Sequence, residues 1–117
     1  CKQKDYAKAE TTFRRLLKKD PSYIMAYIQL GKISYEKNEF KTAKKYLLEA
    51  LEKTFSDSYP SSEYIDLHYY RGLIAVKEGN KLEALMAYMD IKNIYTYTKE
   101  DTDKKLALYK AIRKMEE

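Results

Sequence analysis

Apolar residues recur along this chain at the i, i+3, i+4, i+7 spacing of amphipathic helices. The first such segment, residues 4–19, has an apolar stripe opposite a face of lysines and arginines. The stripe comprises Tyr6, Ala9, Phe13, Leu16 and Leu17. Asp20-Pro21 follows, and a proline disfavours helix in the residue before it. The pattern therefore predicts a helix that ends at this dipeptide.

Two further helices are predicted over residues 22–37 and 40–53. Ser22 is a suitable N-cap for the first of them, and Asn38 tolerates the left-handed backbone that a tight turn after a helix requires. The inward side chains are predicted to be Ile24, Tyr27, Ile28, Leu30, Gly31 and Ser34 in the first helix, and Phe40, Ala43, Tyr46, Leu47, Ala50 and Leu51 in the second. Together the two segments predict a helical hairpin.

Residues 54–62 contain four serines, one aspartate and one proline, and these turn-forming residues indicate a loop. Three more helices are predicted after it, over residues 62–78, 81–95 and 101–116, with Gly79 as the stop between the first two. The predicted inward residues are Leu82, Ala84, Leu85, Tyr88, Met89 and Ile91, then Leu106, Tyr109 and Ile112, with Leu108 and Met115 to one side. The chain is thus predicted to be all-α, with about six helices.

One short helical phrase occurs three times. Asp5-Tyr6-Ala7-Lys8-Ala9 resembles Glu39-Phe40-Lys41-Thr42-Ala43, with an offset of 34 residues between their final alanines. A third copy, Asn80-Lys81-Leu82-Glu83-Ala84, follows after 41 residues. The longer second step is explained by the loop over residues 54–62. A period in this range is typical of stacked helical hairpins.

These copies resemble the tetratricopeptide repeat family. The best copy comprises Ala26, Tyr27, Leu30, Gly31, Tyr35, Phe40, Ala43, Leu47, Ala50 and Leu51. The resemblance implies a right-handed α-solenoid in a single domain, 1–117: the second helix of a truncated repeat (1–21), full repeats at 22–55 and 63–96, and a C-terminal capping helix (101–116). Arg71 and His68 depart from the family pattern, where a leucine and a large aromatic residue are expected.

The resemblance also implies a concave groove lined by the first helix of each repeat. Helical geometry places two sets of side chains on that face. They are Ile28, Gln29, Lys32, Tyr35 and Glu36, then Tyr69, Tyr70, Leu73, Val76 and Lys77. This mixture of apolar, aromatic and charged groups suits a peptide with apolar anchors. We therefore expect a non-enzymatic interaction module or scaffold that binds a protein or peptide partner.

The charge is uneven along the chain. Residues 1–53 hold 13 Lys/Arg against 7 Asp/Glu, whereas residues 54–117 hold 10 against 11. A basic first half offers an alternative function, the binding of nucleic acid or an anionic membrane. Lysine outnumbers arginine and lacks the planar fork that favours bidentate phosphate contacts, which weighs against nucleic acid. The bland alternative is a well-solvated surface.

No catalytic constellation is evident in the sequence. It has one histidine, one cysteine, no phosphate-binding loop and no nucleophile elbow. His68 is expected to be a structural imidazole, because no second histidine or cysteine accompanies it as a metal ligand. We therefore expect no enzymatic activity, no metal and no cofactor.

The first residue, Cys1, leaves the compartment open. We expect a soluble domain that is either cytoplasmic or tethered through an upstream segment, and the sequence contains no apolar run long enough to cross a bilayer. A lipoprotein beginning at Cys1 is the alternative. If the first segment is half a repeat, Tyr6, Phe13 and Leu17 would be exposed, and this exposure predicts self-association.

Overall fold

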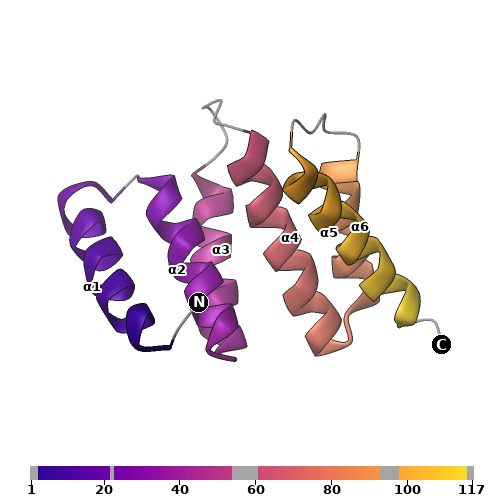
Figure 1. Cartoon of the computed structure of the whole chain (residues 1–117), viewed down its shortest axis with the longest axis horizontal. Coiled ribbons are helices and arrows are strands. Elements are labelled where there is room, and N and C mark those ends of the chain that lie inside the picture. Colours follow the sequence, from indigo (N-terminus) through magenta and orange to yellow (C-terminus); the bar gives the residue numbers. More distant parts are fainter. Residues whose placement is uncertain (1–2, 22, 54–60, 93–97, 116–117) are drawn as a thin grey trace. The chain divides into compact units, whose positions relative to one another are not determined.

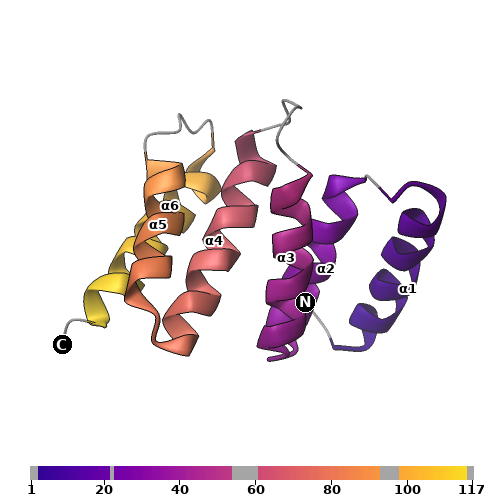
Figure 2. The ribbon, with the colours of Figure 1, turned by 180° about the vertical axis from the view of Figure 1, so that it is seen from behind.

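The computed structural model describes residues 3–21, 23–53, 61–92 and 98–115. Across these ranges the chain forms helices and no strand (Figure 1, Figure 2). The helices are α1 (Gln3–Lys19), α2 (Ile24–Glu36), α3 (Phe40–Glu52), α4 (Ser61–Glu78), α5 (Lys81–Lys92) and α6 (Lys99–Lys114). The predicted all-α helical repeat is confirmed. The chain divides into two compact units, an N-terminal unit (Cys1–Asp57) and a C-terminal unit (Ser58–Glu117).

Helix ends differ from the expected positions by a few residues. The N-cap of α2 is Tyr23, whose side chain makes no capping hydrogen bond, whereas the expected cap, Ser22, lies outside the described residues. Helix α6 begins two residues earlier than expected, because Thr98 caps it and accepts a hydrogen bond from the Asp101 amide at 3.0 Å. The predicted 54–62 loop and the end of the predicted 81–95 helix lie largely outside the described residues.

The α2–α3 and α4–α5 turns use the same backbone device. Asn38 and Gly79 both have positive φ, at 64° and 74°. The next amide donates back to a carbonyl near the helix end: Glu39 to Ser34 at 2.8 Å, and Asn80 to Ala75 at 2.9 Å. This is the Schellman geometry, which pairs carbonyls that the helix leaves without partners. The expected left-handed Asn38 is therefore confirmed, and each turn reverses the chain into an antiparallel hairpin.

Two glycines allow helices to approach closely. A Cβ built on Gly31 of α2 would lie 2.7 Å from Cδ2 and 2.8 Å from Cγ of Leu47 on α3. A Cβ on Gly72 of α4 would lie 2.7 Å from Cδ1 of Leu108 on α6. Both leucines are fully buried. In each unit, the missing side chain of one glycine leaves the space that a leucine of the neighbouring helix fills.

Helix α1 packs against α2 in the N-terminal unit. Lys37, just after α2, donates from Nζ to both carboxylate oxygens of the buried Glu10 on α1, at 3.2 and 3.3 Å. The apolar stripe of α1 was predicted to be buried, with Tyr6, Phe13 and Leu17 exposed if the segment is half a repeat; these three side chains are half-buried. The inward prediction for Leu16 was wrong, since this side chain is 36% exposed.

The core of the C-terminal unit comprises Ile65, Ala75, Ala84, Ile91, Leu108 and Ile112. The inward predictions for Leu82 and Met89 were wrong: they are 70% and 61% exposed. The buried stripe of α5 contains Ala84 and Ile91, and on a 3.6-residue helix Leu82 lies on the opposite side. The face of α5 that packs on its neighbours therefore comprises Ala84, Ala87 and Ile91.

The inward face of α6 is also shifted from the predicted one. Leu108, expected to one side, is fully buried beneath Gly72, whereas Leu106 and Tyr109 are 49% and 40% exposed. Leu108 and Ile112, four residues apart, form the buried stripe. Leu108 fills the space beside Gly72. Leu106 and Tyr109 therefore lie on the outward side of α6.

Gly31→Ala tests the close approach of α2 and α3. Alanine favours a helix over glycine by about 1 kcal/mol, but the overlap with Leu47 costs about 1–3 kcal/mol. We expect a net loss of unfolding free energy of about 1 kcal/mol, measured by urea denaturation. In a Leu47→Ala background the added methyl group no longer overlaps the Leu47 side chain, so the same substitution should become stabilising. The same sign in both backgrounds would contradict the packing.

Candidate functional site

A buried charged cluster links α4 to α5 in the C-terminal unit. Arg71, only 8% exposed, donates from Nε and Nη2 to Oε2 of Glu83 at 3.2 and 3.0 Å. Its Nη1 lies 2.8 Å from Nδ1 of His68 and 3.4 Å from Oδ2 of Asp90. A buried guanidinium is tolerated only where acceptors and opposite charge surround it. We call these four residues the Arg71 cluster.

His68 is held neutral inside this cluster. A guanidinium can only donate, so Nδ1 of His68 accepts and the ring proton is assigned to Nε2. Burial lowers the pKa of His68 from 6.5 to about 4; the positive charge of Arg71 acts in the same direction, and Asp90 opposes it. Tyr64 packs edge-on against the ring, with centroids 4.4 Å apart.

The Arg71 cluster has the features of a structural element. His68 is 1% exposed, and its Nε2 is buried without a hydrogen-bond partner among the described residues. Arg71 and His68 are the two positions at which the sequence departs from the family pattern, which has a leucine and a large aromatic residue there. The departures are thus accommodated by ion pairs to α5, which take the place of apolar contacts between the helices.

A second ion pair joins α4 to α6. Lys104 bonds to the carboxylate of Asp66, which is buried, and lies 3.5 Å from Oε2 of Glu100. Burial alone would lower the pKa of Lys104, but its hydrogen bond to Asp66 and the nearby carboxylates outweigh burial and raise it. Lys104 is therefore charged and fixed in position at neutral pH.

Four of the five predicted α4 residues are half-buried. Tyr69 and Tyr70 pack edge-to-face, with ring centroids 5.0 Å apart at 77°. Tyr69, Leu73 and Val76 pack against the core of the C-terminal unit. Lys77 is exposed. The predicted set therefore combines core contacts with partly accessible aromatic rings.

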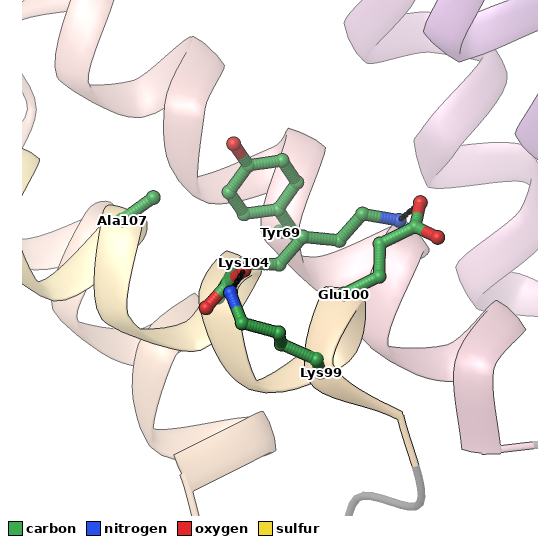
Figure 3. A pocket seen from close by; sticks show the side chains of 6 residues that line it. Tyr69, Lys99, Glu100, Lys104 and Ala107 are labelled. Atoms are coloured by element: carbon green, nitrogen blue, oxygen red, sulfur yellow. Dashed lines mark hydrogen bonds and ion pairs between the residues drawn. The ribbon is translucent and has the colours of Figure 1, made fainter.

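Tyr69 lies on a hollow of about 450 Å³ between α4 and α6 (Figure 3). The remaining lining comes from α6: Lys99, Glu100, Asp103, Lys104 and Ala107. An ion pair of 3.1 Å joins Lys99 to Asp103. The hollow therefore has one aromatic wall and one wall of alternating charges. From the sequence, α6 was predicted only as a capping helix, although the i, i+4 spacing of these charged residues indicates a common face.

The predicted α2 residues offer less surface. Ile28 is fully buried, and Gln29 donates to the Met25 sulfur at 3.4 Å. Tyr35 packs against Phe40, with ring centroids 5.4 Å apart. Lys32 is half-buried and Glu36 is exposed. Their assignment to a binding face stays a prediction, and Ile28 acts as a packing residue in the described structure.

The basic half of the chain places a charged face on α1. The exposed basic side chains are Lys8, Arg14, Arg15, Lys18 and Lys19. Arg15 and Lys19 line a small hollow of about 160 Å³ together with Thr12 and Leu16. The alternative function of this half, binding nucleic acid or an anionic membrane, stays a prediction, as does self-association.

Among the described side chains, no group of three or more His, Cys, Asp or Glu residues is arranged to hold a metal ion. Within the same part of the chain, none of the helices has the length and apolarity required to cross a bilayer.

The fold and its surfaces define a class of protein: helical hairpins with repeated Gly/Ala contacts and no reactive constellation evident in the described residues. Comparison with known families makes this specific. The family described as "Tetratricopeptide repeat" matches residues 2–61, about half of the chain. The chain belongs to the tetratricopeptide repeat family.

A curated relative is similar over a longer stretch. The chain is 31% identical over 85 residues to "ALBINO3-like protein 3, mitochondrial" of Arabidopsis thaliana. The similarity covers 69% of this chain but only 15% of that relative. The chain thus corresponds to a small part of that protein. No solved structure matches the chain.

Stability should fall in mild acid because of His68. The unfolded chain has an imidazole pKa near 6.5 and the folded chain one of about 4, so between these values only the unfolded state takes up the proton. The contribution of neutral His68 to the free energy of unfolding is about 3 kcal/mol. It is fully present above pH 6.5 and is lost as the pH falls toward 4. Urea denaturation at pH 7 and pH 4 should show a smaller acid loss for His68→Gln than for the unmodified chain. Equal losses would contradict the assignment.

The effect of the Arg71 charge on the pKa of His68 can be separated from the effect of burial by NMR titration of the sole histidine. Arg71→Leu removes a charge that lowers the pKa of His68, so the pKa should rise. Asp90→Asn removes a charge that opposes the lowering, so the pKa should fall further. The two variants shift the same resonance in opposite directions only if both groups face His68. A shared direction, or no shift, would rule out this arrangement.

Proposed function

We propose that the chain is a non-enzymatic protein-binding module whose C-terminal unit holds a partner peptide on the face of α4. Membership of the tetratricopeptide repeat family supports the general class, since this repeat generally mediates protein–protein interaction. The observation that carries the proposal is the position of Tyr69. Its ring lines an open hollow that charged side chains of α6 complete (Figure 3).

The chemistry of the hollow favours a peptide with an aromatic or aliphatic anchor. Tyr69 and Tyr70 supply rigid aromatic surface that loses little conformational entropy on binding. Along the α6 wall, where Lys99 pairs with Asp103 and Lys104 lies near Glu100, a peptide meets charged groups of both signs. A short extended or helical peptide with one apolar anchor between charged residues fits this lining.

A rigid base supports the two tyrosines. On the same helix, Arg71 ties α4 to Glu83 and Asp90 of α5, and Asp66 with Lys104 ties α4 to α6. Side chains on a helix that is fixed on two sides bind with less reordering than side chains on a loop. The proposed binding face is therefore preorganised.

A binding role also agrees with the chemistry of the ionisable groups. His68 is buried and neutral, and the described carboxylates of the Arg71 cluster are paired with a guanidinium. An acid or base in catalysis must reach a substrate proton, and these groups are directed at each other. The proposal is accordingly a scaffold or adaptor role without catalysis.

The test uses peptides selected from a display library with the 117-residue chain. Tyr69→Ala/Tyr70→Ala should weaken binding of a selected peptide by about tenfold or more, because buried aromatic anchors at interfaces contribute about 1–2 kcal/mol each. Fluorescence anisotropy measures the Kd, and circular dichroism verifies that the helices persist.

Tyr23→Ala is the matched control. Tyr23 is 41% exposed, lies in the N-terminal unit and makes no capping hydrogen bond through its side chain, so its removal should leave the Kd unchanged. The proposal fails if the double variant keeps its helicity and binds as tightly as the unmodified chain.

A further inference from the structure

A second concave surface lies between α5 and α6, away from the side chains that line the Tyr69 hollow. It is a groove of about 330 Å³, lined by Leu85 and Tyr88 of α5 and by Tyr109, Ile112 and Arg113 of α6. The Tyr88 and Tyr109 rings meet across it with centroids 5.6 Å apart. Helices α5 and α6 pack against each other and against α4. The groove is thus built on the rigid core of the C-terminal unit.

An exposed apolar stripe extends the α5 wall of this groove. Leu82, Met86 and Met89 are 70%, 48% and 61% exposed. They recur at i, i+4 and i+7, and residues three or four apart are neighbours on a helix, so Leu82 and Met89 flank Leu85 of the groove. Methionine is enriched on surfaces that adapt to partner helices. We call the groove and this stripe together the α5–α6 surface.

The α6 wall adds apolar area and positive charge. Leu106 and Tyr109 are 49% and 40% exposed. The guanidinium of Arg113 stacks over Tyr109, 5.7 Å from the ring centroid, and its Nη1 donates to the Tyr109 hydroxyl at 3.3 Å. This stacking holds a positive charge at the lip of an apolar groove. Five of the eight large apolar side chains that are exposed in the described structure lie on α5 and α6.

The positive charge of this surface lies on its α6 side, where Arg113 lines the groove. On α5, Glu83 and Asp90 lie three and four residues from Met86 and therefore beside the stripe. Both carboxylates are bound to Arg71. A partner that brings negative charge to the α6 side is therefore complementary.

We propose that the α5–α6 surface docks an amphipathic helix of a partner protein, with an apolar stripe in the groove and acidic residues beside it. Helices seat in apolar grooves through anchors at i, i+3/i+4 and i+7, the spacing that the α5 stripe itself presents. A second copy is disfavoured as the occupant, because the carboxylates that it would bring beside the stripe, Glu83 and Asp90, are already bound to its own Arg71. A lipid surface is disfavoured by the concavity of the groove.

The docking site is independent of the α4 face, and the test keeps the two apart. The probe is a designed, fluorescently labelled helical peptide with leucines at i, i+4 and i+7 and glutamates flanking them. A second peptide has the same leucines with lysines in place of the glutamates. The 117-residue chain should bind the acidic peptide at least about tenfold more tightly than the basic one in fluorescence anisotropy, and the preference should shrink as salt rises.

Three variants assign the binding to this surface. Met86→Gln/Met89→Gln should weaken the acidic peptide by about tenfold, and Arg113→Gln should reduce the preference for the acidic peptide. Leu48→Gln, which changes a 42% exposed leucine of α3, should leave the affinity unchanged. Tyr69→Ala/Tyr70→Ala should also leave it unchanged, so failure at α4 and failure here give different results.

Four outcomes of the peptide experiments overturn the proposal. These are no binding of the acidic peptide at about 100 μM, equal binding of the two peptides, unchanged binding by the methionine variant, or equal loss in the Leu48→Gln control. Light scattering and sedimentation with phosphatidylserine vesicles cover the other occupants. A dimer, or vesicle binding, that disappears in Met86→Gln/Met89→Gln would assign the surface to a second copy or to lipid, and would likewise overturn it.

Discussion

The close approach of helices at glycine is the constraint on which the rest of the structure depends. In each unit one helical glycine lies where a methyl group would overlap a buried leucine, Gly31 over Leu47 and Gly72 over Leu108. Because interiors are packed as densely as organic crystals, this contact fixes which side of each partner helix is buried. The exposed side of α6 follows from it: because Leu108 fills the space beside Gly72, Leu106 and Tyr109 face outward.

Ion pairs connect α4 to its neighbouring helices at positions where apolar side chains do not. Arg71 occupies a position where an apolar residue would ordinarily pack, and its charge is balanced by Glu83 and Asp90 of the next helix. Buried ion pairs of this kind add little net stability compared with apolar contacts, but loss of one partner is costly. The result is an α4 helix fixed by specific partners on both sides, with Tyr69 on the remaining surface.

Much of the fold could be predicted from the sequence because its signals are local. The helix-ending Asn38 and Gly79, the Asp20-Pro21 stop and the repeated small residues each act within a few positions, and the structure places them as expected. The inward faces of α5 and α6 could not be predicted in this way. Large apolar residues such as Leu82 and Met89 suggested burial, whereas the selection of Ala84 and Leu108 depends on contacts between helices distant in sequence. The hollow beside Tyr69 was missed for the same reason, since its other wall is supplied by α6.

The close approach can be measured directly by nuclear Overhauser effects in the uniformly labelled chain. The account predicts strong cross-peaks from the Hα protons of Gly31 to the methyl groups of Leu47, and from those of Gly72 to the methyl groups of Leu108. Cross-peaks from Gly72 to Leu106 or Tyr109 in place of Leu108 would mean that α6 presents a different face to α4. That result would contradict the packing and, with it, both surfaces derived from it.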